Sequence, residues 1–256
     1  MEQQRIEIER PRSLAEIIGE ALDLYQSYPL LFTGLALGVI APYELAVLAA
    51  TGAGPLSNQS HLAPGVRLLL FLLDYALVGP LVSALQVHAV MQIGTGERPR
   101  LTRVAKTGLR VLPDVVAAVV AAGLAIGLGF LALIIPGILL ALRWSVVAQA
   151  AAIERGGWFP ALRRSGELTR GNYWRIFGLL LITGLVSGGV TVALAAVPLG
   201  STAGVASVAV GILARTLTAS FTALTLALLY FDLRARSAGR GPDLGTPHER
   251  DPGGQR

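Results

Sequence analysis

Residues Pro136–Leu180 read PGILLALRWSVVAQAAAIERGGWFPALRRSGELTRGNYWRIFGLL and contain both kinds of segment from which the whole chain is built. An apolar segment comes first, interrupted by a single arginine, Arg143. It ends at the polar residues Glu154–Gly157, and a short basic segment follows. Trp174 then begins another long apolar run. Apolar runs separated by basic polar segments are typical of polytopic membrane proteins, and the rest of the chain repeats this pattern.

The composition of the chain also indicates a membrane protein. Of its 256 residues, 53% are hydrophobic and only 14% are charged, and the mean hydropathy is +0.62. Soluble domains usually carry about 25% charged residues. The chain has no cysteine, which excludes disulfides, thiolate metal sites and cysteine nucleophiles. Charged side chains recur throughout residues 1–29, so we expect no cleavable signal peptide.

Six apolar segments are long enough to cross a membrane. An α-helix needs about 20 apolar residues to cross a hydrocarbon core of about 30 Å. The third and fourth segments form one continuous run, and we expect a tight hairpin at Pro136–Gly137, because a single helix over the whole run would overshoot the bilayer. The predicted fold is an all-α membrane protein whose single domain, 13–231, contains spans near 30–50, 67–91, 114–135, 136–154, 174–197 and 203–231.

The distribution of positive charge predicts the orientation of these helices. Nearly all of the 21 Lys and Arg residues lie in the polar N-terminal segment 1–12, between the second and third spans, between the fourth and fifth spans, or in the tail 232–256. The alternate loops hold a single one, Arg67. Since positive residues stay cytoplasmic, we predict that both termini face the cytoplasm. The tail is rich in Gly, Pro and charge and is predicted to be disordered.

A weak repeat adds detail to this topology. An amphipathic segment begins near Pro11, Pro99 and Pro160, and each is followed by two spans. In the first, Ser13 and Glu16 are spaced as a capping box, in which each side chain accepts a hydrogen bond from the backbone of the other. We interpret these segments as cytoplasmic-side surface helices, which gives three units of a surface helix and a transmembrane hairpin. The alternative is that the loops are amphipathic without any repeat.

Short patches of sequence carry a family resemblance: Ser13–Ile17, Pro136–Ile138, Leu142–Trp144, Ala161–Ser165, Glu167–Gly171, Trp174–Gly178 and Tyr230–Arg236. In these patches the chain resembles the bacterial integral membrane family named after the membrane domain of glycerophosphoryl diester phosphodiesterases. Gly166 departs from the family, which typically has a bulky residue there. The resemblance implies a multi-pass α-helical domain of unknown role in the bacterial cytoplasmic membrane. It implies no phosphodiesterase activity, because that chemistry belongs to a separate soluble domain for which this chain has no room.

Three ionisable side chains, Asp74, Arg143 and Arg215, are candidates for a polar site within the spans. A charge at the centre of a span costs roughly 2.5–3.5 kcal/mol, so these side chains should face the bundle interior and find partners. Asp74 and Arg143 are predicted at the same depth, about 10 Å from the outer ends of their spans, and we expect them to pair. The three residues form either a site on the path of a substrate or headgroup, or a structural ion pair that fixes the helix register.

Two basic segments beside the spans are candidates for contact with anionic lipid headgroups. Lys and Arg clusters next to a span attract such lipids by about 1 kcal/mol per residue, and Trp158, Tyr173 and Trp174 lie nearby as interfacial anchors. The alternative is that these segments only fix topology. The candidate residues are Arg103, Lys106, Arg110, Arg163, Arg164, Arg170 and Arg175.

Pairs of glycines four residues apart recur in the predicted spans. Gly34 and Gly38 form one such pair, and Gly184 and Gly188 form another. Small residues at this spacing let helix backbones approach closely. We interpret them as packing within one chain, with a homodimer or another membrane-protein partner as the alternative.

Known catalytic motifs are absent from the sequence. The three histidines are scattered, and no H-E-x-x-H, P-loop or G-x-S-x-G pattern occurs. We therefore expect no enzymatic activity and no cofactor, and no nucleic-acid partner because the basic residues lie against a membrane. The expected role is an accessory or lipid-contacting membrane module. The alternative is a small transporter or permease that uses Asp74, Arg143 and Arg215, and a polar cavity reaching those residues would favour it.

Overall fold

The computed structural model describes residues 10–56, 59–96, 101–154, 156–196 and 204–239, and within these ranges the chain forms helices and no strand. Six helical segments of the described residues are long and apolar enough to cross a membrane, which confirms the predicted number of spans. Most of the polar segment 1–12, and the tail beyond 239, lie outside the described residues.

The first two helices are α1 (Leu14–Ser27) and α2 (Pro29–Thr51). The predicted capping box begins α1: the Glu16 N–H donates to Ser13 Oγ at 3.2 Å, and the Ser13 N–H donates to the Glu16 carboxylate at 2.5 Å. Pro29 stands at the first position of α2, where its missing N–H would have had no partner within the helix. The chain therefore turns from α1 into the first span within two residues.

The second span changes its winding in the middle. It consists of α3 (Pro64–Leu73), a π-helical turn, η2 (Asp74–Val78), and α4 (Gly79–Gly94). The Gly79 N–H donates to the carbonyl of Asp74, five residues earlier. Pro80 accounts for the wider turn, because proline has no N–H to donate and its ring clashes with the carbonyl four residues before it in an α-helix. Single π-turns inside α-helices are frequent at functional sites.

The third span is the single 32-residue helix α5 (Leu101–Ala132). This corrects the predicted boundary at 113–114, since the second amphipathic segment forms the first turns of the span and not a separate surface helix. The predicted apolar face is present: Val104 and Gly108 are buried, whereas Arg103 and Lys106 are exposed. The Cα of Gly108 packs against Leu85 of α4 so closely that a Cβ there would lie 2.7 Å from the leucine side chain. This contact packs the N-terminal part of α5 against α4.

The hairpin between the third and fourth spans turns at Leu133, three residues before the predicted position. Leu133 has an extended backbone, with φ −164° and ψ 149°, and α6 (Ile134–Arg143) begins directly after it. Pro136 lies in the first turn of α6. Proline is tolerated there because the first N–H groups of a helix have no partner within it, so Pro136 lies inside the second helix and does not separate the two.

The fourth span is also broken, into α6 and the short α7 (Val147–Ile153). Two hydroxyl groups of α8 (Trp158–Thr169) stabilise the break: Ser165 Oγ and Thr169 Oγ1 each donate to the carbonyl of Arg143 at 3.0 Å. These bonds satisfy a carbonyl at the end of a helix, which has no partner within it. Helix α8 therefore packs back against the end of α6, to which it is joined in sequence through α7.

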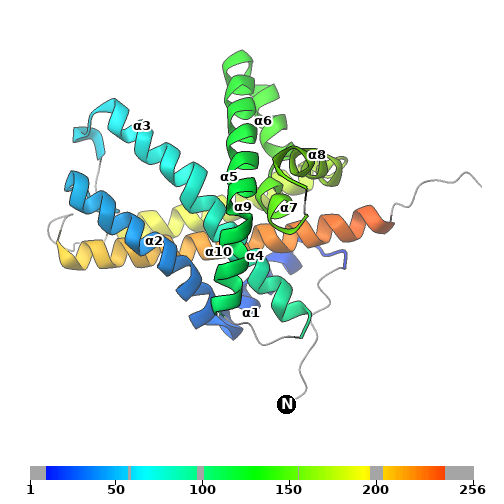
Figure 1. Ribbon diagram of the computed structural model, residues 1–256, viewed down its shortest axis with the longest axis horizontal. Helices are drawn as coiled ribbons and strands as arrows, with labels where there is room; N and C mark the ends of the chain where they lie inside the picture. Colours follow the sequence, from blue (N-terminus) through cyan, green and yellow to red (C-terminus); the bar gives the residue numbers. More distant parts are fainter. Residues whose placement is uncertain (1–9, 57–58, 97–100, 155, 197–203, 240–256) are drawn as a thin grey trace, which may run out of the picture.

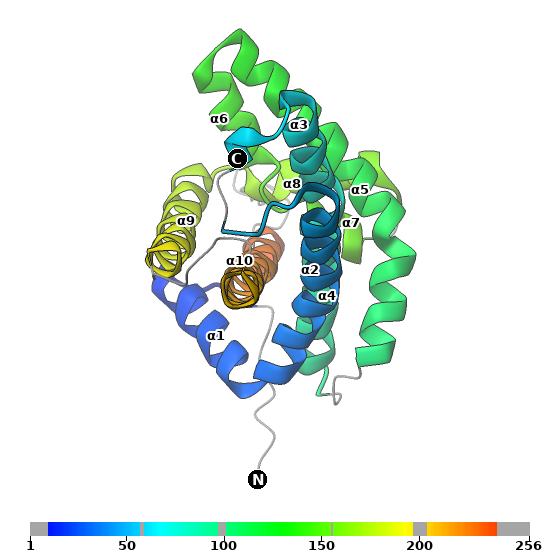
Figure 2. The same ribbon diagram turned by 90° about the vertical axis from the view of Figure 1, so that its left-hand side faces the viewer.

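The last two helices are α9 (Tyr173–Ala195) and the 35-residue α10 (Val205–Gly239). α10 lies in the middle of the molecule and contacts α1, α2, α4 and α9 (Figure 2). It extends beyond Phe231, which corrects the prediction that the chain is disordered from 232 onward. Asp232 is fully buried and binds three other residues, so its charge is satisfied inside the protein and the helix continues.

The spans form three antiparallel pairs, namely α2 with α3–α4, α5 with α6–α7, and α9 with α10. The pairs share one apolar core, to which α1, α4, α5, α7, α8 and α10 all contribute buried residues. From this region they point in different directions (Figure 1). The short helices α1 and α8 precede the first and third pairs, whereas the second pair has no separate short helix.

Candidate functional site

The guanidinium of Arg215, on α10, binds two carboxylates from different helices. One amino group donates to Glu44 on α2, and the other donates to Asp74 at the start of the π-helical turn. A charge inside a span needs such partners, because hydrocarbon does not solvate it. The three residues link the first, second and sixth spans at one point.

The predicted pair of Asp74 with Arg143 is wrong, because Asp74 pairs with Arg215. The error lies in the assumed span boundaries. In the structure the second span begins at Pro64 and the sixth at Val205, so Asp74 and Arg215 each follow the start of their span by ten residues. At 1.5 Å per residue this puts both about 15 Å along their spans.

Glu44 is a site residue that the sequence interpretation missed. It is the only charged residue between Pro29 and Thr51, so the argument that selected Asp74 also applied to it. Its side chain is 4% exposed, compared with 42% for Asp74. Glu44 is thus the buried anchor of the arginine, and Asp74 is the partner nearer to the surface.

An aromatic ring supports the same arginine from a third side. The Cζ atom of Arg215 lies 5.3 Å from the centre of the Tyr43 ring, within the range of a cation–π contact. The Tyr43 hydroxyl donates to the carbonyl of Leu70 at 3.0 Å, which ties α2 to α3 just before the π-helical turn. The arginine is therefore held in a fixed position and not free to swing.

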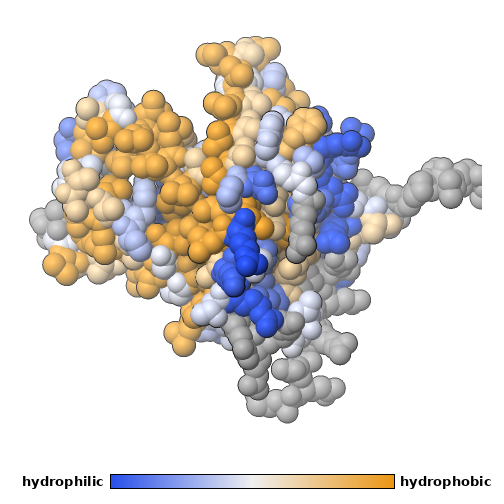
Figure 3. All heavy atoms as spheres, in the orientation of Figure 1, coloured by the Kyte–Doolittle hydropathy of each residue, from blue (hydrophilic) through white to orange (hydrophobic). Residues whose placement is uncertain are grey.

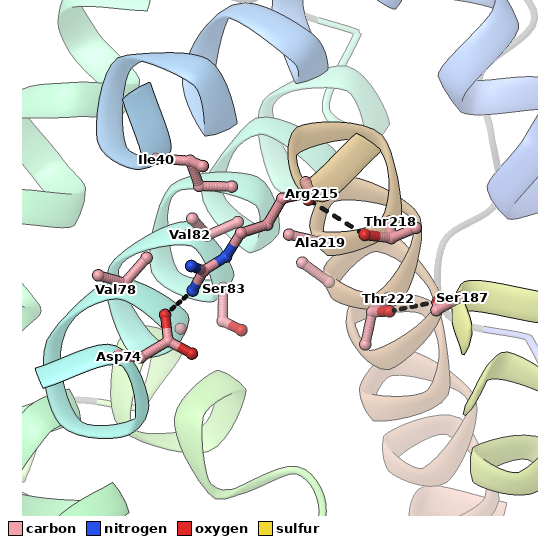
Figure 4. A pocket seen from close by; sticks show the side chains of 12 residues that line it. Ile40, Asp74, Val78, Val82, Ser83, Ser187, Arg215, Thr218, Ala219 and Thr222 are labelled. Atoms are coloured by element: carbon pink, nitrogen blue, oxygen red, sulfur yellow. Dashed lines mark hydrogen bonds and ion pairs between the residues drawn. The ribbon is translucent and has the colours of Figure 1, made fainter. Parts of the chain in front are cut away.

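We call Glu44, Asp74 and Arg215 the ion-pair cluster. A cavity of about 310 Å³ opens beside it, and Figure 4 shows Asp74 and Arg215 in the lining of this cavity. Its apolar walls include Ile40 and Val82. Its polar lining consists of Asp74, Arg215 and four hydroxyl residues: Ser83, Ser187, Thr218 and Thr222.

The hydroxyls that line the cavity come from three helices. Ser83 lies on α4, Ser187 on α9, and Thr218 and Thr222 on α10. Ser187 and Thr222 are 3.3 Å apart and share a hydrogen bond, and Thr218 donates to the carbonyl of Ala214 at 2.9 Å. Helix α9 thus lines the cavity on the side opposite α4 (Figure 4), and of the three helix pairs only the second does not contribute to it.

The ion-pair cluster has a net charge of −1, since two carboxylates face one guanidinium. Uncompensated charge is unfavourable in an apolar surrounding. The cluster therefore favours a cation or a hydrogen-bond donor in the adjoining cavity. Among the described residues no group of three or more His, Asp or Glu side chains has the arrangement of a metal site.

Arg143 lies apart from this site. Its side chain is exposed, and its guanidinium passes over α8, where a Cβ on Gly166 would lie 2.8 Å from Arg143 Nε. This contact gives a physical reason for the small residue at 166, at which the sequence departs from the family it resembles. Arg143 forms no ion pair with Asp74 in the described part of the chain, and it does not line the cavity.

The seven basic headgroup candidates fall into two groups. Arg103, Lys106, Arg110, Arg163 and Arg170 are exposed. Arg164 and Arg175 are partly buried and bind Glu154 and Asp232 respectively, at 2.9 and 3.1 Å. Figure 3 shows hydrophilic residues gathered over the N-terminal part of α5 and over α8, whereas apolar residues cover α2, α3 and the far ends of α5 and α6.

Comparison with curated proteins and with solved structures finds no match. No comparison links the chain to the membrane domain of glycerophosphoryl diester phosphodiesterases or to bacteria. One family model does match, over residues 63–233, which is more than half of the chain and includes Asp74 and Arg215 but not Glu44. The chain therefore belongs to the family described as a domain of unknown function, DUF7847.

Proposed function

We propose that this protein is a small permease-like membrane protein that binds a small cationic or proton-donating solute in the cavity beside Arg215. The observation that carries the proposal is the cavity itself, which reaches two of the three predicted polar residues, Asp74 and Arg215, and excludes the third, Arg143. A bundle that used these charges only to fix its packing would enclose them without adjoining space.

The charge of the site supports a cationic ligand. The ion-pair cluster carries one negative charge more than it can neutralise, and the four hydroxyls offer oxygen acceptors around the same space. A cavity of about 310 Å³ is at the small end of the range for ligand sites. The solute class is thus small, polar and positively charged or protonated, and the chain is proposed to act on it without catalysis.

A second candidate function is a lipid-contacting accessory module, and the exposed basic residues beside apolar surface favour it. Under either function we propose the bacterial cytoplasmic membrane as the location, from the family resemblance, with both termini in the cytoplasm, from the distribution of Lys and Arg. With this orientation α1 and α8 are the cytoplasmic-side helices. A homodimer remains an alternative partner arrangement.

Access of water to the cavity tests the permease proposal. The sequence contains no cysteine, so an introduced cysteine supplies the only thiol that can react. Ser187→Cys places a thiol in the cavity lining. Leu185→Cys, two residues away on α9, places one on a side chain that is 67% exposed on the apolar surface. Membrane-impermeant thiosulfonate reagents of either charge are then applied to right-side-out and inverted vesicles.

We expect Ser187→Cys to react and Leu185→Cys to remain unreactive, because thiosulfonates modify thiols in water. The cationic reagent should react several-fold faster than the anionic one. Asp74→Asn should remove this preference, because it brings the ion-pair cluster to neutrality. Labelling from both vesicle orientations supports a permease. If Ser187→Cys is as unreactive as Leu185→Cys, the cavity is dry and the permease proposal fails.

A further inference from the structure

A second cavity, of about 670 Å³, lies between α6 and the beginning of α9. We call it the α6–α9 groove. Its apolar wall consists of Ile138, Leu139 and Leu142 from α6, with Phe177 from α9. Ile138, Leu139 and Phe177 are each 38–48% exposed, so the groove is open to the apolar surroundings of the spans and presents a surface suited to a hydrocarbon chain.

One end of the groove is polar and lies at the first turn of α9. Asn172, Tyr173, Trp174 and Arg175 line this end. The first N–H groups of a helix have no partner within it, and together with the helix dipole they attract anions. Asn172 precedes α9 and makes no side-chain cap bond to it. The first turn of the 23-residue helix α9 thus remains available to an anionic group.

The side chains at this end carry surplus positive charge. Asp232 binds both Arg175 and Arg236, so this set of three has a net charge of +1. The Nε atom of Arg175 is buried and has no hydrogen-bond partner among the described residues. Arg175, which lines the groove, is therefore a cation with one unpaired N–H, while its amino group donates to Asp232 and to the carbonyl of Arg12.

A second arginine, Arg143, lies near the groove but does not line it, because its guanidinium lies over Gly166 of α8. Arg143 follows the groove residue Leu142 on α6, and its carbonyl is held by Thr169, close to the turn that leads into α9. The Arg143 side chain is exposed, and no ion pair is found for it within the described residues. Trp174 is 87% exposed and packs edge-on against Phe177 at 6.2 Å, which is typical of an interfacial anchor.

We propose that the α6–α9 groove binds an anionic phospholipid, with its phosphate at the first turn of α9 beside Arg175 and an acyl chain along Ile138, Leu139 and Phe177. The exposed side chain of Arg143 turns from α8 toward this phosphate when the lipid binds. The inference rests on the lipid-contacting candidate function and is independent of the cavity beside Arg215. It assigns Arg143, predicted as an intramembrane site residue, to headgroup recognition. A phospholipid is the occupant because the apolar wall and the cationic end belong to one continuous groove.

Quenching of tryptophan fluorescence by brominated lipids tests this proposal on the whole chain. Trp144→Phe and Trp158→Phe leave Trp174 as the only tryptophan. This variant is reconstituted in vesicles containing either brominated phosphatidylglycerol or brominated phosphatidylcholine at the same mole fraction. We expect phosphatidylglycerol to bind about fivefold more strongly for each arginine that contacts the headgroup.

Two further variants separate the headgroup from the chain. Arg143→Gln should lower the preference for phosphatidylglycerol about fivefold. Leu139→Phe narrows the groove without adding a second tryptophan, and it should weaken quenching by both lipids. Leu131→Phe, on α5 at an 83% exposed position outside the groove, is the matched control and should change neither.

Equal quenching by the two lipids, or a preference that survives Arg143→Gln unchanged, overturns the proposal. The cysteine-labelling result at Ser187 does not depend on this outcome, because Ser187 lines the other cavity. If lipid quenching shows no preference but Ser187→Cys is labelled, the permease proposal stands and the lipid site does not. If the quenching preference is found but Ser187→Cys is not labelled, only the lipid site stands.

Discussion

The buried carboxylate of Asp232 should be the most sensitive charged position in the chain outside the cavity. Its side chain is 0% exposed. It accepts the backbone N–H of Arg12 at 2.6 Å, the guanidinium of Arg175 at 3.1 Å and that of Arg236 at 3.1 Å. One carboxylate thus joins the segment before α1, the first turn of α9 and the last turns of α10.

These contacts determine how much the free energy of unfolding should fall in Asp232→Asn. Removing one partner of a buried ion pair typically costs about 3–5 kcal/mol, because the remaining charge loses its compensation. Arg175 and Arg236 are 19% and 29% exposed and regain some hydration, and the asparagine oxygen still accepts one hydrogen bond. We therefore expect the lower end, a loss of about 3 kcal/mol in the free energy of unfolding.

Unfolding in mixed micelles of a mild detergent and sodium dodecyl sulfate, followed by circular dichroism, measures this loss. Arg163→Gln is the matched control, because it breaks an ion pair whose arginine is 77% exposed and should cost only about 0.3–0.5 kcal/mol. In a double-mutant cycle, Asp232→Asn and Arg175→Gln should show a coupling above about 0.5 kcal/mol. If Asp232→Asn costs no more than the control, the carboxylate is not the link inferred here.

Three other positions give testable predictions: two glycines at which alanine should have opposite effects on stability, and one glutamate whose effect should depend on pH. A Cβ on Gly129 would lie 3.2 Å from the Cα of Gly137 and 2.9 Å from a methyl group of Leu140, so Gly129→Ala should destabilise the protein by about 1–3 kcal/mol. Gly34→Ala meets no atom within 4 Å and should stabilise it by about 0.5–1 kcal/mol; equal melting temperatures of the two variants in detergent would contradict the packing of α5 on α6. The hydrogen bonds from the backbone and side chain of Ser13, together with Arg10, lower the pKa of Glu16 below its usual 4.5. A lowered pKa in the folded state adds stability that is present above the unfolded-state pKa and is lost as pH falls, so Glu16→Gln should reduce the melting temperature at pH 7 and have no effect once the pH is below the folded-state pKa of Glu16. A difference that persists in acid would mean that the capping box does not depend on the charge.

Local signals in the sequence were sufficient for the elements that depend only on neighbouring residues. The long apolar runs require helices, since a backbone in lipid must satisfy its own hydrogen bonds, and the six spans follow from their lengths. The capping box at Ser13 and Glu16 needs only two side chains three residues apart. The amphipathic face at Val104 and Gly108 is likewise a property of helical spacing.

Boundaries were less predictable because proline has different effects at different positions. The sequence predicts a break at Pro136, but this residue is accommodated in the first turn of α6. Pro113 lies inside α5 without ending it, and Pro80 widens one turn of the second span. Which of these outcomes occurs depends on what packs against the helix, as Leu85 does at Gly108, and a single sequence does not contain that information.

The stretch from Pro136 to Leu180 shows which features follow from the local sequence and which depend on tertiary contacts. By itself the sequence determined that this stretch contains apolar helices separated by a basic amphipathic one, because helix formation and burial follow from local periodicity and hydropathy. Only the tertiary structure decided that Arg143 lies over α8 while Asp74 pairs with Arg215 and Glu44. Ion pairs between spans depend on which helices are neighbours, and depth along a helix does not specify its lateral neighbours.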